Sequence, residues 1–274
     1  MVDIARLSHD LPPFHDGRPI HTHLICSHCL VFQRDSGAKL SRCAACSSAF
    51  YCSKKCQVDA WPTHKSECKL AKQQAAAVAA LTGLTSAYAD LLDWIRYYEA
   101  PLKNCAVAAF RVRTNPHAER TSIMCVELSY KGAAAANLPV QLRFTVRNVG
   151  LKSAGDFPAG STLREMDASH PAYRSAVARG KIEMGAQFYG TGCLAVLTQF
   201  AEMLPPVPNV KMFAIDRETA FAKPTERDCW ELFREYVNVG AKLRFCCGRV
   251  RGASTCCCGG WVHDEEKKRA FKEA

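Results

Sequence analysis

The sequence lacks long apolar runs and the common nucleotide-binding motifs. No window approaches the about 18 consecutive apolar residues of a membrane-spanning helix, which argues against an integral membrane protein. Residues 1–25 carry several charged side chains and no apolar stretch, so we expect that they are not a cleavable secretory signal. Neither Gly-x-x-x-x-Gly-Lys-Ser/Thr nor Gly-x-Gly-x-x-Gly occurs, which argues against the phosphate-binding loops built on these motifs.

Cysteine, by contrast, is abundant, with 16 residues in a chain of 274. Potential zinc ligands concentrate between residues 26 and 68 as four regular pairs: Cys26/Cys29, Cys43/Cys46, Cys52/Cys56 and His64/Cys68. Four thiolate or imidazole ligands close one tetrahedral structural site, so eight predict two zinc ions with no open position for water. Cysteines used as metal ligands, together with the missing signal, predict a reducing compartment, either cytoplasm or nucleus.

The spacing within each pair predicts local structure. Cysteines separated by two residues fit tight turns, whereas pairs four positions apart share one face of a helix. Pro62 can open the second of these two helices, while Ser53 is a poor cap for the first. Because so short a segment has few large apolar residues, we expect zinc to supply on the order of 10 kcal/mol or more of its folding free energy.

The motif Phe50-Tyr51-Cys52-Ser53-Lys54-Lys55-Cys56-Gln57, followed by Trp61 and His64-Lys65-Ser66-Glu67-Cys68, resembles the MYND zinc finger. The resemblance covers residues 26–68. It implies interleaved sites, with Cys26, Cys29, Cys52 and Cys56 on one zinc and Cys43, Cys46, His64 and Cys68 on the other. Spacing alone allows a serial pairing equally well.

The resemblance also implies a function, because MYND fingers act as protein-interaction modules for short proline-rich peptides. It places the peptide groove at Ser53, Gln57 and Trp61, beside the second zinc. An alternative for Trp61 is that it is buried as the large core residue of the finger. The chain contains proline-rich segments of its own, at 11–14 and 204–208, and either could occupy the groove in cis.

Catalysis has little support in the sequence. Some MYND proteins carry a SET methyltransferase domain, but the Asn-His-Ser-Cys stretch typical of that site is absent. Cys193 in Gly190-Thr191-Gly192-Cys193 could act as a nucleophile with His170 or His117 as base, but a structural cysteine at the start of a strand is the favoured interpretation. We therefore expect an adaptor or a transcriptional-regulator-like protein, with an unassigned enzyme in the C-terminal region as the alternative.

The predicted organisation is an α+β protein with a small two-zinc finger. A flexible, histidine-rich arm (1–25), the finger (26–68), a helical connector (69–100) and an α+β domain (101–274) follow one another. Gly83 should break the connector into two helices, the second ending before Pro101. Strands are expected at 121–130, 140–149, 192–200 and 210–215, loops at 132–137 and 150–161, and helices at 171–179 and 224–240.

The C-terminal region and the net charge leave two further hypotheses. A third metal cluster could form from Cys246, Cys247, Cys256, Cys257, Cys258 and His263, although incidental thiols are the favoured interpretation. The formal charge of +10 suggests nucleic acid as a partner. Seven thiolates and two Zn²⁺ ions lower this charge to about +7 and leave the finger near neutral, so nucleic-acid binding ranks last.

Overall fold

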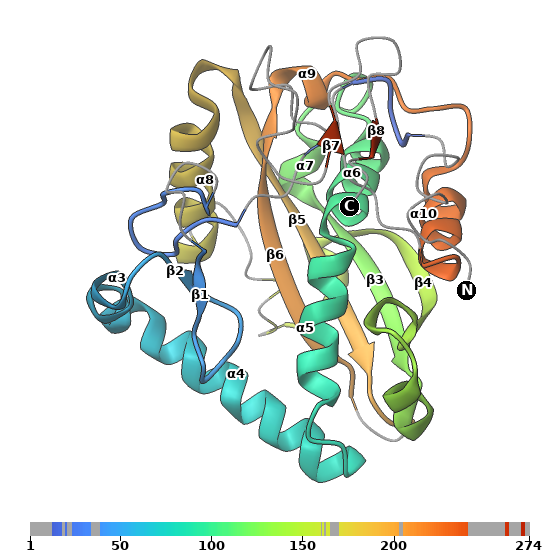
Figure 1. Ribbon diagram of the computed structural model, residues 1–274. Coiled ribbons are helices and arrows are strands. Elements are labelled where there is room, and N and C mark those ends of the chain that lie inside the picture. The colour runs from blue at the N-terminus through green and yellow to red at the C-terminus, as the bar shows by residue number, and fades with distance from the viewer. Residues whose placement is uncertain are drawn as a thin grey trace.

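Figure 1 shows the computed structural model, in which helices pack against a mixed four-stranded sheet. The small segment that carries the predicted zinc ligands, with β1, β2 and α3, lies at one side. This arrangement confirms the predicted α+β fold class. The structure describes residues 13–17, 20, 24–33, 39–159, 161, 163–164, 170–202, 205–240, 261–262 and 270–271.

The sheet has the strand order β4-β3-β5-β6 and is antiparallel except between β3 and β5. Its strands are β3 (Ser122–Tyr130), β4 (Phe144–Ser153), β5 (Phe188–Gln199) and β6 (Val207–Asp216). A parallel pair needs a crossover connection, and the chain supplies one that includes helix α8 (Pro171–Met184). The predicted strand at 121–130 is nearly correct. Strand β5 begins before its predicted start at residue 192, and β6 extends beyond both of its predicted bounds.

Strand β4 differs most from the prediction. The expected strand at 140–149 begins only at Phe144, after a 3-10 turn at Val140–Leu142, and it continues to Ser153 through part of the predicted loop. The pairing register shifts at Glu127, leaving Arg147 as the extra residue of a bulge. The next buried side chain after Phe144 is therefore Val149, because a bulge reverses the alternation of faces.

The helices show where tertiary contacts override local signals. They are α3 (Lys54–Asp59), α4 (Trp61–Thr82), α5 (Ala87–Tyr97), α6 (Glu99–Phe110), α7 (Ala118–Thr121), α8, α9 (Arg217–Ala220) and α10 (Cys229–Asn238). The second connector helix, α5, ends at Tyr97 and so before Pro101, as predicted, and Pro101 itself lies in the first turn of α6, where a missing N–H costs nothing. Pro224 does not start α10, which is capped instead by Asp228. Residues 132–137 form a 3-10 helix.

Very short strand pairs and turns complete the described elements: β1 (Ser41–Arg42) with β2 (Phe50–Tyr51), β7 (Trp261–Val262) with β8 (Ala270–Phe271), and the 3-10 turns Ala154–Asp156 and Gly185–Gln187. Among the described residues, no single helix is long and apolar enough to cross a membrane. Helices α4 and α5 reach that length and composition only together, and they meet at a bend of 119°.

The main core lies between one face of the sheet and helices α5, α6 and α10. Its largest fully buried side chains include Trp94, Tyr98 and Phe110, and the ring of Phe144 on β4 meets Trp94 at 6.0 Å. A smaller core that includes Cys125 and Cys193 fills the opposite face. The sheet is therefore covered on both faces.

Part of the predicted arm belongs to the main core. Phe14 stacks on Tyr236 of α10 at 5.2 Å, and Asn104 of α6 bonds both the backbone of Ile20 and the ring of His15. His15 is 2% exposed, although a flexible, histidine-rich arm would leave its histidines in solvent. The partner of His15 lies 89 positions away, so no local pattern could indicate it. His9, His21 and His23 lie outside the described residues.

Gly192 of β5 provides a test of core packing. A methyl group there would lie 2.7 Å from Phe213 Cζ and 3.0 Å from Phe110 Cε2. We expect Gly192→Ala to lower the free energy of unfolding by about 1–3 kcal/mol, because ring tips in a packed core must move. Gly150→Ala in β4 meets nothing within 4 Å and serves as the matched control. Equal midpoints of urea unfolding for both variants would contradict this packing.

Candidate metal centre

Two tight turns present the cysteine pairs that are separated by two residues. The Leu30 N–H donates to Cys26 O at 3.1 Å, and the Ser47 N–H donates to Cys43 O at 2.9 Å. Leu30 (φ 61°) and Ser47 (φ 58°) are left-handed, although neither is glycine. Each turn therefore directs two sulfurs to the same side and contains one residue with a strained backbone. The sequence does not reveal this strain.

Of the two ligand pairs separated by three residues, only His64 and Cys68 lie together on a helix. Cys52 precedes the first residue of α3 and only Cys56 lies within it, so the predicted shared helical face is wrong for that pair. Ser53 caps α3, since its hydroxyl accepts from the Cys56 N–H at 3.1 Å. The expectation that Ser53 is a poor cap is therefore wrong. His64 and Cys68 lie one turn apart on the buried face of α4, which begins with Pro62 in its first turn. This helix does not stop after its ligands but continues to Gly83, whose φ of 70° ends it.

The eight ligand atoms form two groups, each with all members within 4.8 Å of one another: Cys26, Cys29, Cys52 and Cys56; and Cys43, Cys46, His64 and Cys68. The grouping is interleaved rather than serial. Sulfur–sulfur distances are 3.4 Å for Cys52–Cys56, 3.6 Å for Cys29–Cys52 and 3.9 Å for Cys43–Cys68.

These distances test the fit to zinc. With Zn–S bonds of about 2.3 Å, two sulfurs of one tetrahedron lie about 3.8 Å apart. The Cys46 Sγ to His64 Nε2 distance of 3.5 Å also suits a shared ion. A group of four cysteines and a group of three cysteines with one histidine, both of this size, fit two zinc ions, one each. All four positions are filled by protein in each group, so the ions would be structural.

The surroundings lower the pKa of Cys26 and Cys46, which favours their thiolates, but raise the pKa of Cys52. Burial would raise the pKa of Cys26, but backbone N–H groups of Cys52, Cys29 and His28 lower it to about 6. Burial would likewise raise the pKa of Cys46, but the Ser48 hydroxyl, 3.1 Å away, helps to lower it. Contacts with the Cys56 and Cys29 thiols raise the pKa of Cys52 to about 12. This crowding of sulfurs is what a divalent cation relieves.

The finger has a small core of its own and also contacts the rest of the protein, which is built on the main core. Tyr51 is 2% exposed and fills the space beside His64, at 5.9 Å between rings. Arg42 of β1 reaches Asp93 of α5 at 2.8 Å. Ala71 of α4 packs against both the finger core and the main core. Helix α4 therefore joins the zinc ligands to the body without a break.

The three predicted peptide-binding residues lie on the outside of the finger. Ser53 is exposed, Gln57 is partly exposed, and Trp61 is 45% exposed. The alternative that Trp61 is the buried core residue is therefore wrong, because Tyr51 has that role. Val58 of α3 is also exposed, at 59%. Trp61 also meets the ligand His64 at 6.1 Å, edge to face.

Those of the other candidate residues that the structure describes do not form a site. Cys193 is buried, and burial raises the pKa of its thiol to about 12, as expected of a structural cysteine. His170 caps α8 by accepting from the Ala172 N–H, and His117 is the left-handed residue before α7. Of the proline-rich segments, Phe14 is in the core and Pro208 pairs with Leu197 in the sheet. The C-terminal candidate ligands, residues 246–258 and His263, lie outside the described residues.

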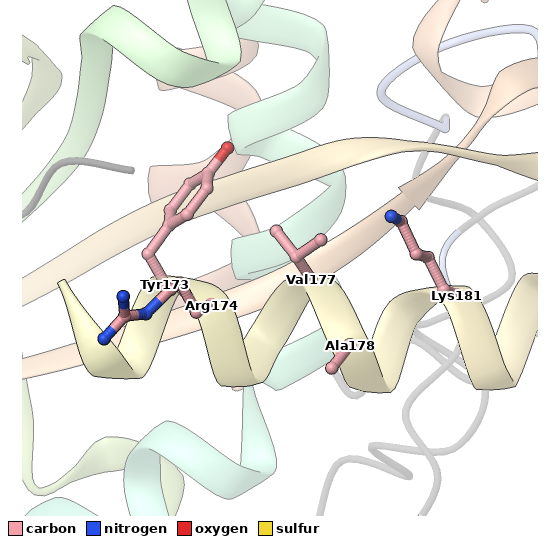
Figure 2. A pocket seen from close by; sticks show the side chains of 5 residues that line it. All are labelled: Tyr173, Arg174, Val177, Ala178 and Lys181. Atoms are coloured by element: carbon pink, nitrogen blue, oxygen red, sulfur yellow. The ribbon is translucent and has the colours of Figure 1, made fainter. Parts of the chain in front are cut away.

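A hollow of about 310 Å³ is lined by side chains of α8 alone, which Figure 2 shows: Tyr173, Arg174, Val177, Ala178 and Lys181. Tyr173, Val177 and Lys181 point to one side, while Arg174 points away from them. An active site brings acid, base and positioning groups together from several elements. The described residues that line this hollow come from one helix, so they do not form such an active site.

The two sites are interleaved and each has four protein ligands, four cysteines in one and three cysteines with a histidine in the other. Such a pair of sites, presented by two turns and two helices, defines a cross-braced structural zinc finger. Residues 26–68 match the family model of the MYND finger, so this segment is a MYND-type zinc finger. MYND fingers are protein-interaction modules.

Curated relatives match over the finger only. Histone-lysine N-methyltransferase SMYD3 of Homo sapiens is 49% identical over 49 residues, which are 18% of this chain and 10% of that protein. N-lysine methyltransferase SMYD2 of Homo sapiens is 49% identical over 43 residues, 16% of this chain and 9% of that protein. SMYD2-B of Danio rerio is 48% identical over 46 residues, 17% and 10% of the two chains. The matched segment thus spans a tenth or less of these relatives, and no solved structure matches.

Proposed function

We propose that the surface formed by Ser53, Gln57 and Trp61 binds a short proline-rich segment of a partner protein, and that the chain acts as an adaptor. The observation that best supports this proposal is the exposed position of Trp61. A tryptophan that is 45% exposed beside a rigid metal site offers a large apolar face at little entropic cost. Zinc would hold that face in place but take no part in a reaction.

The three residues lie close together along the chain. Gln57 lies one helical turn after Ser53, the N-cap of α3, and Trp61 begins α4 directly after Ala60, which caps both helices. An extended proline-rich peptide loses little conformational entropy when it docks on an aromatic ring, and the Gln57 amide can bond its backbone. The Ser53 hydroxyl is engaged with the Cys56 N–H as a cap, so its contribution would be to shape the surface.

We further propose the cytoplasm or nucleus as the compartment, because the finger thiols are arranged for metal and not for disulfides. The relatives with methyltransferase names also contain a MYND finger, but they match this chain only there. An enzymatic activity in the C-terminal region is therefore a separate hypothesis that the finger does not support.

Trp61→Ala is expected to weaken binding of a proline-rich peptide at least tenfold, because truncating a central aromatic contact typically costs more than about 1.4 kcal/mol. The measurement is fluorescence polarisation of labelled peptides selected from a proline-rich array. Leu70→Ala, on the same helix and 56% exposed, is the control. Its affinity should equal that of the unaltered protein.

Zinc content and circular dichroism of both variants should match the unaltered protein, since neither side chain is a ligand. Equal affinity of the Trp61→Ala variant and the Leu70→Ala variant would exclude this surface as the peptide site. If the array captured no proline-rich peptide at all, the proposed ligand class would be wrong.

A further inference from the structure

Two cysteines outside the finger meet where helix α10 begins. Cys105 lies in the middle of α6 and is 0% exposed, whereas Cys229 is the first residue of α10 and is partly exposed. The Cys105 thiol donates to the Cys229 carbonyl oxygen at 3.4 Å, so the two residues are in direct contact. Because these residues are 124 positions apart, only the fold brings them together.

The two thiols have different environments. Burial raises the pKa of Cys105 well above its ordinary value, so this sulfur keeps its proton. The pKa of Cys229 is lowered, first by the adjacent Cys105 side chain and also by the nearby Arg111, against opposing effects of burial and Asp228. A fully buried cysteine in contact with a partly exposed cysteine whose pKa is lowered is the asymmetry of reactive dithiols.

We propose that Cys229 and Cys105 form a redox-active pair, in which Cys229 reacts with hydroperoxides and Cys105 resolves the product as a disulfide. The Cys229 thiolate attacks the peroxide oxygen, which breaks the O–O bond, gives a sulfenic acid and releases an alkoxide or hydroxide that takes up a proton. The Cys105 thiol then attacks that sulfur and forms the S–S bond, and water leaves. Two thiols are oxidised and one hydroperoxide is reduced to an alcohol or water.

The two helices that carry the pair also hold the docked N-terminal residues. Asn104, next to Cys105, bonds the backbone of Ile20, and Tyr236 of α10 stacks on Phe14. A disulfide would fasten the start of α10 to α6 and so fix both sides of this docking site. The inference is independent of peptide binding by the finger, because it involves none of the zinc ligands.

The test uses the full-length, zinc-loaded protein treated with less hydrogen peroxide than protein. Remaining thiols are then alkylated, and the digested protein is mapped by mass spectrometry. We expect a peptide that joins Cys105 to Cys229, lighter by two hydrogen atoms than the reduced pair and absent after dithiothreitol, with zinc content unchanged. The midpoint of thermal unfolding should rise by about 5 °C or more in the oxidised form.

Two variants separate the roles of the cysteines. Cys105→Ala should leave a sulfenic acid on Cys229 that a 1,3-dione reagent captures, and Cys229→Ser should leave Cys105 reduced under the same treatment. If oxidation joins only other cysteines, or consumes Cys229 in the unaltered protein while Cys105 stays alkylatable, the proposal is overturned. Disulfide mapping of the unaltered protein tests the proposal even if a variant fails to fold.

Discussion

Removal of zinc is expected to unfold the finger while the sheet and helices α5, α6 and α10 remain folded. The two cores are separate clusters, and the finger core is small, so most of its stability comes from metal–ligand bonds worth on the order of 10 kcal/mol or more. The main core has no zinc ligand in it. Loss of zinc should therefore be a local unfolding event.

Helix α4 makes this prediction specific, because it spans both cores. Its first half is held by His64 and Cys68, and its second half by the packing of Ala75 and Val78 on the main core. After chelation, hydrogen exchange should become fast at residues 39–68 and stay slow in α5 and the sheet. Protection along α4 should fall away toward its N-terminal end.

Hydrogen-exchange mass spectrometry before and after a zinc chelator measures this gradient. The control is the same chelator already loaded with zinc, which should change nothing, and added zinc should restore protection. A uniform loss of protection across residues 39–240 would show that the two cores are one cooperative unit. An unchanged finger would show that zinc is not what stabilises it.

The metal centre could be predicted from the sequence because its chemistry is local. The spacing of cysteine and histidine fixes which side chains share a turn or a helical face, and eight such ligands leave little choice of ion. Spacing does not decide how the pairs combine, since both pairings have the same local geometry. That choice depends on how the finger folds back on itself, which the structure shows in the contact between Cys29 and Cys52.

The less accurate predictions share a physical cause, namely contacts between residues far apart in the chain. The buried state of His15 depends on Asn104, and the bulge in β4 depends on the register against Glu127. The length of α4 is a different case. Its alanine-rich sequence has no helix breaker between Cys68 and Gly83, so the continuity of the helix is visible in the composition.

Asp90→Ala is expected to destabilise the main body by about 3–5 kcal/mol, a large part of the about 5–15 kcal/mol that holds a typical domain together. Asp90 is 5% exposed and pairs with the Arg143 guanidinium, while the Tyr130 hydroxyl donates to it at 2.8 Å. Burial, with help from Asp90, raises the pKa of Tyr130 to about 12, so the hydroxyl remains a donor. Truncation would leave Arg143 without its counter-charge.

Asp93→Ala is the matched control on the same helix. Asp93 pairs with Arg42 at 2.8 Å and with Arg96 at 2.9 Å, but its side chain is 41% exposed. Solvent screens such pairs, so we expect a loss of about 1 kcal/mol or less. Urea unfolding followed by circular dichroism gives both values, and similar losses for the two variants would contradict the assignment of Asp90 as a buried ion pair.

A double variant separates the lost charge from lost packing. Replacing both partners with apolar residues, Asp90→Leu with Arg143→Met, should recover most of the stability, because the cost of the single change arises from an unpaired buried charge. The Tyr130 hydroxyl would still lack its acceptor and should keep a deficit of about 1–3 kcal/mol. Adding Tyr130→Phe to the double variant should remove that deficit. If the triple variant remains as unstable as the double variant, the deficit does not come from the Tyr130 hydroxyl, and packing around Asp90 contributes more to stability than the ion pair does.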